Sequence, residues 1–173
     1  IGPFNLPAES NALLVFEVRP NAFAPLAAES EITNEVTVTG TGIANAPTAT
    51  ETVAVLSAPA LSISKTVCPK TVSENGQINY TFIIQNSGNV AAAAGDNIVI
   101  TDVFDPILGS LSVALDGVAW TQGTEYTYNE TTGEFASTVG AITVPAATYT
   151  QNADGSFTVT PGVATLTITG TIV

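Results

Sequence analysis

Three polar side chains lie on strand faces that the sequence otherwise fills with apolar residues. Alternate side chains of a β-strand point to opposite faces, so in the segment LSISKTVC Lys65 shares its face with leucine, isoleucine and valine. By the same parity, Asp102 in NIVITDVF and Asn34 in EITNEVTVT point to the apolar sides of their strands. A shift of one residue would expose each apolar set, so this register is hard to escape. The sequence therefore places an amine, a carboxyl group and a carboxamide against a hydrophobic core.

These three groups are the set needed for an isopeptide bond. Burial disfavours the ionised forms of both Lys65 and Asp102. A neutral amine is a nucleophile, and a protonated carboxyl group can hydrogen-bond a carboxamide and transfer protons. The Nζ of Lys65 would attack the side-chain carbonyl of an asparagine such as Asn34 and release ammonia. Fixed geometry can supply an effective molarity on the order of 10⁵ M, and the reaction would occur once per molecule, as self-maturation rather than turnover.

A purely structural interpretation stands beside this one. Lys65 would form a buried salt bridge with Asp102, and Asn34 would hydrogen-bond to the backbone. A lysine near a strand end can also extend its ammonium group to water. An unreacted buried ion pair stabilises a fold weakly, because desolvation offsets the attraction. Both interpretations remain open at this point.

The elements that must position these residues are short strands. Turn signals such as ENG, NSGN, DPILG, NETTG and NADG separate segments of alternating or β-branched residues. Strands of this length and spacing are typical of an antiparallel β-sandwich. Only the alanine run within residues 89–97 could form a helical turn. The predicted strands are 12–18, 31–39, 48–56, 60–67, 77–86, 97–104, 110–117, 124–130, 133–138, 141–144, 155–161 and 164–173.

An internal similarity divides the chain into two units. ALLVFEVRPN near the start resembles ATLTITGTIV near the end, but only the first copy is followed by two further strands. We therefore expect residues 1–57 to be the terminal strands of a partial repeat, with a donor-type hairpin at 31–56. Residues 58–173 would be a sandwich that lacks its closing hairpin.

Three arrangements could supply the missing hairpin. Asn34 could belong to an upstream lysine while Lys65 has a separate partner, the hairpin could fold back onto residues 58–173, or it could insert into the next subunit by strand donation. Open apolar sheet edges are seldom left unpaired. We favour the version between subunits or between repeats.

Several of these segments together carry a family resemblance. LSISKTVCPK, YTFIIQNSGN, VITD and ATLTIT resemble, in that order, the conserved repeat domain of bacterial surface proteins called domain of unknown function 11. The closing motif of that family is present as EITNEVTVT, but in the partial unit. The resemblance implies an immunoglobulin-like sandwich on the bacterial cell surface that serves as a stalk or fibre module. The lysine, acid and asparagine are also similar to the set in collagen-adhesin-type pilin domains, which implies self-crosslinking roles for Lys65, Asp102 and Asn34.

Composition excludes several other classes. Of 173 residues, 45% are hydrophobic and only 10% are charged, against roughly 25% charged in ordinary domains. A net charge of −12 argues against nucleic-acid binding. No apolar run reaches the roughly 18 residues of a membrane span. The chain has no histidine and one cysteine, so His-dependent nucleophilic catalysis, the usual zinc sites and an internal disulfide are not expected. We predict no cofactor and no metal.

The chain also begins without an initiator methionine or a signal-peptide pattern, which predicts a trimmed piece of a longer protein. Scattered aspartates leave one calcium ion possible, and Trp120 beside a tyrosine-rich hairpin could contact a glycan. We therefore expect an extracellular structural subunit that assembles with neighbouring copies of itself, not an enzyme. The alternative is a surface adhesin module that binds a host glycan or protein. The acidic side chains weighed for calcium or for catalysis are Asp96, Asp102, Asp105, Asp154, Glu125, Glu130 and Glu134.

Overall fold

A computed structural model describes residues 4–173 and shows an all-β, antiparallel fold. The longest strand, β12 (Gly162–Ile172), pairs with β4 on one side and with β6 on the other. Among the described residues no helix is long and apolar enough to span a membrane. The other elements are β1 (Glu31–Thr37), β2 (Thr48–Ala54), β3 (Leu61–Cys68), β4 (Gln77–Asn86), the 3₁₀ turn η1 (Ala94–Asp96), β5 (Thr101–Val103), β6 (Leu108–Leu115), β7 (Val118–Trp120), β8 (Tyr126–Tyr128), β9 (Glu134–Ser137), β10 (Thr148–Gln151) and β11 (Phe157–Thr160).

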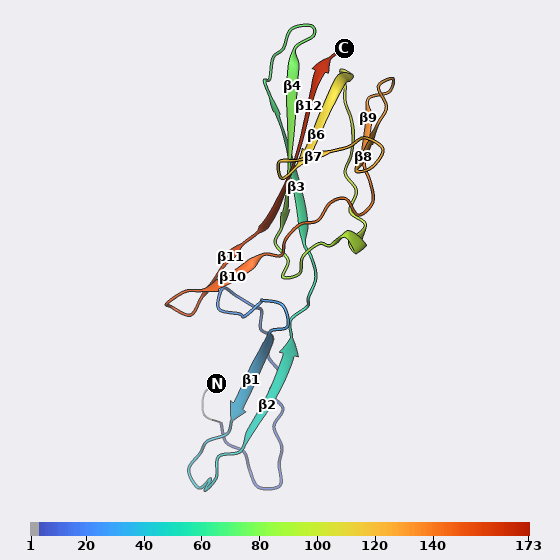
Figure 1. The fold of residues 1–173 in the computed structure, drawn as a ribbon. Helices are drawn as coiled ribbons and strands as arrows, with labels where there is room; N and C mark the ends of the chain where they lie inside the picture. Colours follow the sequence, from blue (N-terminus) through green and yellow to red (C-terminus); the bar gives the residue numbers. More distant parts are fainter. Residues whose placement is uncertain (1–3) are drawn as a thin grey trace.

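Two sheets enclose the core, as the strand pattern predicts for a β-sandwich. The larger has the order β3-β4-β12-β6-β7 and the smaller the order β5-β9-β8. In Figure 1, β8 and β9 of the smaller sheet lie beside the larger sheet. Phe104 follows β5 and joins the layers, with its ring centroid 5.0 Å from Tyr80 of β4 and 6.1 Å from Phe135 of β9. In β12 the apolar members of the ATLTIT alternation, Ala164 and Leu166 among them, are completely buried. Burial of the apolar positions of both sheets is what holds this part of the chain together.

The structure differs from the predicted strand list in four places. Residues 12–18 form no strand, although their sequence resembles that of β12, because they have no neighbouring strand with which to pair; Leu13 is 89% exposed. Residues 141–144 contribute only a single bridge, from Val144 to Ala92. The short strands β7 and β10 are not in the predicted list; β10 forms a separate hairpin with β11.

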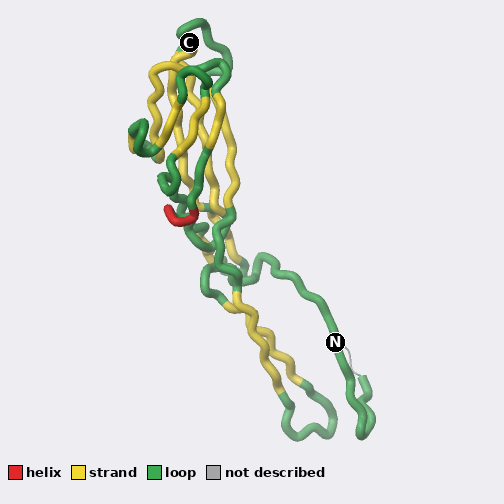
Figure 2. The backbone as a smooth tube through the Cα atoms, turned by 90° about the vertical axis from the view of Figure 1, so that its right-hand side faces the viewer, coloured by secondary structure: helices red, strands yellow, loops and turns green. Residues whose placement is uncertain are grey.

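The β1–β2 hairpin lies beyond one end of the sandwich. Seven residues of β1 pair with seven of β2, and residues 55–60 lead from β2 into β3. Figures 1 and 2 show the hairpin extending away from the end of the sandwich that holds the C-terminus. Neither face of the hairpin is covered by a second sheet layer, so apolar side chains such as Val36 and Val53 stay open to solvent.

Candidate functional site

Lys65 lies at the edge of the larger sheet, on the face that looks toward the smaller sheet. It belongs to β3, directly opposite Phe82 of β4. Its ammonium group forms an ion pair with the carboxylate of Asp102. The Nζ atom also lies 4.6 Å from the ring centroid of Tyr80 and 5.4 Å from that of Phe104. The amine is therefore held by one carboxylate and by the faces of aromatic rings.

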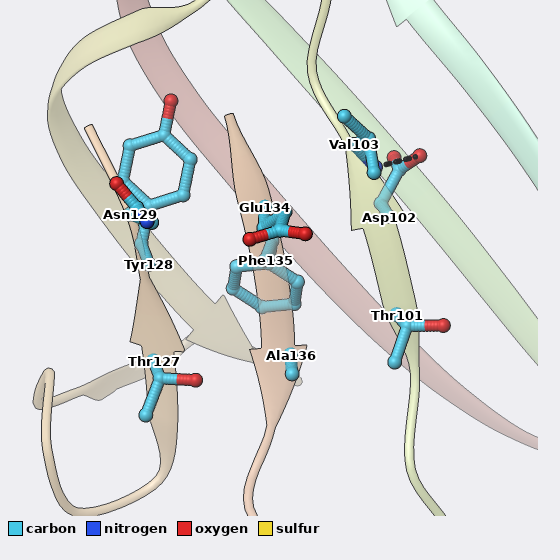
Figure 3. A pocket seen from close by; sticks show the side chains of 9 residues that line it. All are labelled: Thr101, Asp102, Val103, Thr127, Tyr128, Asn129, Glu134, Phe135 and Ala136. Atoms are coloured by element: carbon cyan, nitrogen blue, oxygen red, sulfur yellow. Dashed lines mark hydrogen bonds between the residues drawn. The ribbon is translucent and has the colours of Figure 1, made fainter. Parts of the chain in front are cut away.

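Asp102 reaches Lys65 from the opposite layer. It is the middle residue of β5, opposite Phe135 of β9, and its Oδ1 accepts a 3.0 Å hydrogen bond from the backbone N–H of Val103 (Figure 3). The predicted inward direction of Asp102 is thus what the structure shows, because its parity matches that of the buried Ile100 and Phe104.

The pair is only partly withdrawn from water. The side chain of Lys65 is 39% exposed and that of Asp102 is 18% exposed. Ion pairs open to solvent contribute up to about 1 kcal/mol, and a cation over aromatic rings adds about 0.5–1 kcal/mol at such sites. The predicted salt bridge is present, but this chain alone does not enclose it fully.

Asn34 is not brought to this pair. It lies in β1, is exposed, and stands opposite Glu51 of β2. Its parity is as predicted, since it shares its side of the hairpin with Ile32 and Val36, but no layer covers that side. Val36 is 51% exposed. The structure therefore joins two of the three predicted groups and leaves the third in a separate element.

Two uncovered apolar surfaces result from this arrangement. The receiving face consists of the side chains of β3 that point toward the smaller sheet: Leu61, Ile63, Lys65 and Val67. The hairpin face consists of the matching side of β1 and β2: Ile32, Asn34, Val36, Ala49, Glu51 and Val53. Ile63 is 56% exposed and Val53 is 66% exposed. The receiving face is open because β5, the nearest strand of the smaller sheet, is only three residues long and is its edge strand.

A shallow hollow of about 630 Å³ lies against the smaller sheet (Figure 3). The hollow exists because several of the side chains that line it are small, among them Thr101, Thr127 and Ala136 from three strands. Tyr128 beneath it is anchored by its hydroxyl group, which donates to the carbonyl of Leu108 and accepts from its N–H, both at 2.9 Å. In β8, burial raises the pKa of Tyr126. Threonine hydroxyl groups and two acidic residues, Asp102 and Glu134, are among the groups that line the hollow.

The scattered acidic residues do not gather into an ion site. Within residues 4–173 no group of three or more Asp, Glu or Cys side chains is arranged to hold a metal ion. Asp154 accepts hydrogen bonds from the hydroxyl and backbone N–H of Ser156, and these bonds lower the pKa of its carboxyl group. Glu125 accepts from the backbone N–H of Thr121 at 2.7 Å. These carboxylates stabilise local turns.

Sequence reasoning missed two features. Glu51 faces the same way as Asn34, which the alternation in TATETVAVL shows once the hairpin register is known. Asn86 and Asn89 make structural hydrogen bonds, whereas the sequence of the NSGN segment predicts only a turn. Comparisons of the chain with protein-family models, curated proteins and solved structures give no match.

Proposed function

We propose that this chain is a structural subunit of an extracellular surface assembly or fibre, in which the hairpin face of one copy covers the receiving face of the next. The observation that carries the proposal is the presence, in one chain, of two uncovered apolar β-surfaces of similar length that do not contact each other. β1 has seven residues and β3 has eight. The resemblance of LSISKTVCPK and YTFIIQNSGN to a bacterial surface repeat supports the extracellular location.

Strand addition supplies the driving force. Among the described strands, β3 and β5 are edge strands of their sheets, and so are both strands of the hairpin. An added strand gains main-chain hydrogen bonds from such an edge and specificity from its alternate side chains. Fully burying a valine, leucine or isoleucine side chain contributes about 1.5–3 kcal/mol. Docking the hairpin face over Leu61 and Ile63 buries several such side chains at once.

Docking would also complete the chemical set. The middle of the hairpin face carries Asn34, and the middle of the receiving face carries Lys65. The Nζ of Lys65 attacks Cγ of Asn34, the Nζ–Cγ bond forms and the Cγ–Nδ2 bond breaks. Two protons leave Nζ and depart with the amide nitrogen as ammonium, and the carboxylate of Asp102 accepts the first of them. The cross-link then joins neighbouring copies covalently.

Concentration-dependent assembly tests the strand addition. We expect size-exclusion chromatography and negative-stain imaging to show oligomers or filaments that grow with protein concentration. A chain that remains monomeric at every concentration, with the hairpin still exposed, contradicts the proposal.

Intact mass spectrometry tests the covalent bond separately. Each link removes one ammonia, a loss of about 17 Da that proximity of the two groups makes accessible. The cross-links also yield a ladder of covalent oligomers that boiling in detergent does not separate. Lys65→Arg is the matched control, because it keeps the ion pair with Asp102 but not the primary amine. Assembly without any mass loss would support strand addition and contradict the isopeptide bond.

A second candidate function, adhesion, is favoured by the hollow over the smaller sheet. Its lining of threonine side chains with Asn129 and Glu134 is suited to hydrogen bonds with a glycan or a host protein. Glycan-array binding by a stable monomer, lost on Thr127→Val, would favour this candidate over the structural one.

A further inference from the structure

A turn at the end of β4 hydrogen-bonds to the segment that connects the hairpin to the sandwich. We call residues 86–89, Asn-Ser-Gly-Asn, the clamp, and residues 55–60 the linker. The clamp lies where the hairpin meets the sandwich, beside a partly open cavity of about 510 Å³. Gly88, Asn89, Ile32 and Val53 are among the residues that line it.

Asn89 contacts the linker through both ends of its carboxamide. Its Nδ2 donates to the carbonyl of Leu56 at 3.0 Å and to that of Leu26 at 3.1 Å. Its Oδ1 accepts from the backbone N–H of Ala58 at 3.0 Å. One side chain thus binds the linker on both sides of Ser57 and also holds the chain that precedes β1.

Asn86 fixes the other end of the clamp. It is completely buried, and its Oδ1 accepts from the backbone N–H groups of Ala60 and Gly88, both at 2.9 Å. Its Nδ2 donates to the carbonyl oxygens of Val90 and Pro145 at 2.8 and 3.0 Å. Four hydrogen bonds to one buried side chain make this a rigid support, since any one left unmade would leave a buried polar atom unsatisfied.

Gly88 permits the close approach of the linker. A Cβ atom at this position would lie 2.2 Å from the carbonyl oxygen of Ala58 and 2.5 Å from the nitrogen of Ala60. No other amino acid fits without displacing the linker backbone. The hydrogen bonds that the clamp makes to the linker all go to main-chain atoms, including one of 2.9 Å from the N–H of Ser87 to the carbonyl of Ala60.

We propose that the clamp is a binding site for extended main chain that holds the hairpin pointing away from its own sandwich. Connections between paired strands are commonly two to five residues long, so a freed linker could turn back and let β2 reach the edge of its own β3. The clamped linker instead directs the hairpin outward, as Figures 1 and 2 show. This directing role rests on the proposed function. The clamp keeps the hairpin face away from the receiving face of the same chain, so that the hairpin face can dock on a neighbouring copy.

Distance measurement between two spin labels tests the clamp without reference to assembly. One label is attached to Cys68, the only cysteine and an exposed one, and the other to Thr41→Cys in the hairpin turn, in protein dilute enough to be monomeric. We expect a single narrow distance distribution in the otherwise unchanged chain. Asn89→Ala removes all three contacts of that side chain and should add a second population at shorter distance. Asn89→Asp keeps the acceptor for Ala58 and loses both donors, so it should have an intermediate effect.

The control is Thr132→Ala, which removes hydrogen bonds within the β8–β9 turn and should leave the distribution unchanged. Gly88→Ala should broaden the distribution most, and the fluorescence of Trp120 shows whether each variant keeps its fold. An Asn89→Ala distribution identical to that of the parent chain would overturn the proposal.

The directing role has its own readout. If the parent chain assembles, Asn89→Ala should assemble more slowly and leave a larger closed monomer fraction. Equal assembly despite a broadened distance distribution would overturn the directing role and keep the clamp. A parent chain that never assembles would overturn the proposed function, while the distance measurement would still decide whether the clamp holds the hairpin.

Discussion

β12 and β1 carry similar alternating patterns and meet opposite environments. In β12, Leu166 and Ile168 are fully buried between the two sheets. In β1, Val36 on the equivalent apolar side is 51% exposed. The difference lies in what stands next to each strand: β12 has a strand on both sides and a sheet across the core, whereas β1 has only β2. Alternation thus shows which side of a strand seeks burial, and only the neighbouring layers determine whether it is achieved.

Truncating one side chain in each region tests directly whether β12 is buried and the hairpin is not. Leu166→Ala removes a fully buried side chain and should lower the free energy of unfolding by about 2–5 kcal/mol. Val53→Ala in the hairpin of a dilute monomer should change it by no more than about 0.5 kcal/mol. Urea unfolding of both variants provides the measurement. Equal losses would mean that the hairpin face is covered in the isolated chain.

A charge on the hairpin face should separate assembly from stability. Val36→Lys places an ammonium group on the surface that we propose is buried against Leu61 and Ile63, and unpaired buried charges are strongly unfavourable. We expect filaments or oligomers to be lost while the melting temperature of the monomer is unchanged. Thr37→Lys, on the opposite side of β1, is the matched control and should still assemble. Loss of assembly in both variants would point to net charge rather than to the face.

The ion pair should have a small effect in the monomer and a larger one in the assembly. A double-mutant cycle of Lys65→Met and Asp102→Asn should give a coupling free energy of up to about 1 kcal/mol, because the lysine is 39% exposed. Raising the salt concentration should reduce it. If covering the receiving face withdraws the pair from water, the coupling should increase in assembled protein. A coupling energy that assembly leaves unchanged would place the pair outside the interface.

The smallest expected effect is the pH response of the β10–β11 turn. The Ser156 hydrogen bonds hold the pKa of Asp154 below its usual value of 3.8 in the folded chain. Because the pKa is lower in the folded chain than in the unfolded chain, the ionised carboxylate stabilises the fold at pH values above the unfolded pKa. This contribution is lost as the pH falls through the folded pKa. An NMR titration should therefore find the Asp154 midpoint below 3.8. Ser156→Ala should raise this midpoint. An unchanged midpoint would show that Ser156 does not lower the pKa of Asp154.

Part of the candidate site followed from parity alone. Lys65 and Asp102 meet because each occupies an apolar position of a strand in a different sheet, and the alternation specifies those positions. The exposure of Lys65 did not follow, since it depends on how far the three-residue strand β5 extends across β3. The distance of Asn34 from this pair also could not be predicted, because it depends on contacts between distant segments, among them the hydrogen bonds from Asn86 and Asn89 to the linker.

Residues 12–18 mark the same limit for the fold. Their sequence resembles that of β12, and they form no strand in this chain because β-structure requires a hydrogen-bonding neighbour that local sequence does not provide. The all-β class, the antiparallel sandwich and the side of each strand that turns inward were encoded locally, in a two-residue period and in turn residues. Which strands are neighbours, which apolar faces stay open and where the hairpin points were decided by contacts between segments far apart in the chain, because burial is a property of layers and not of a single strand.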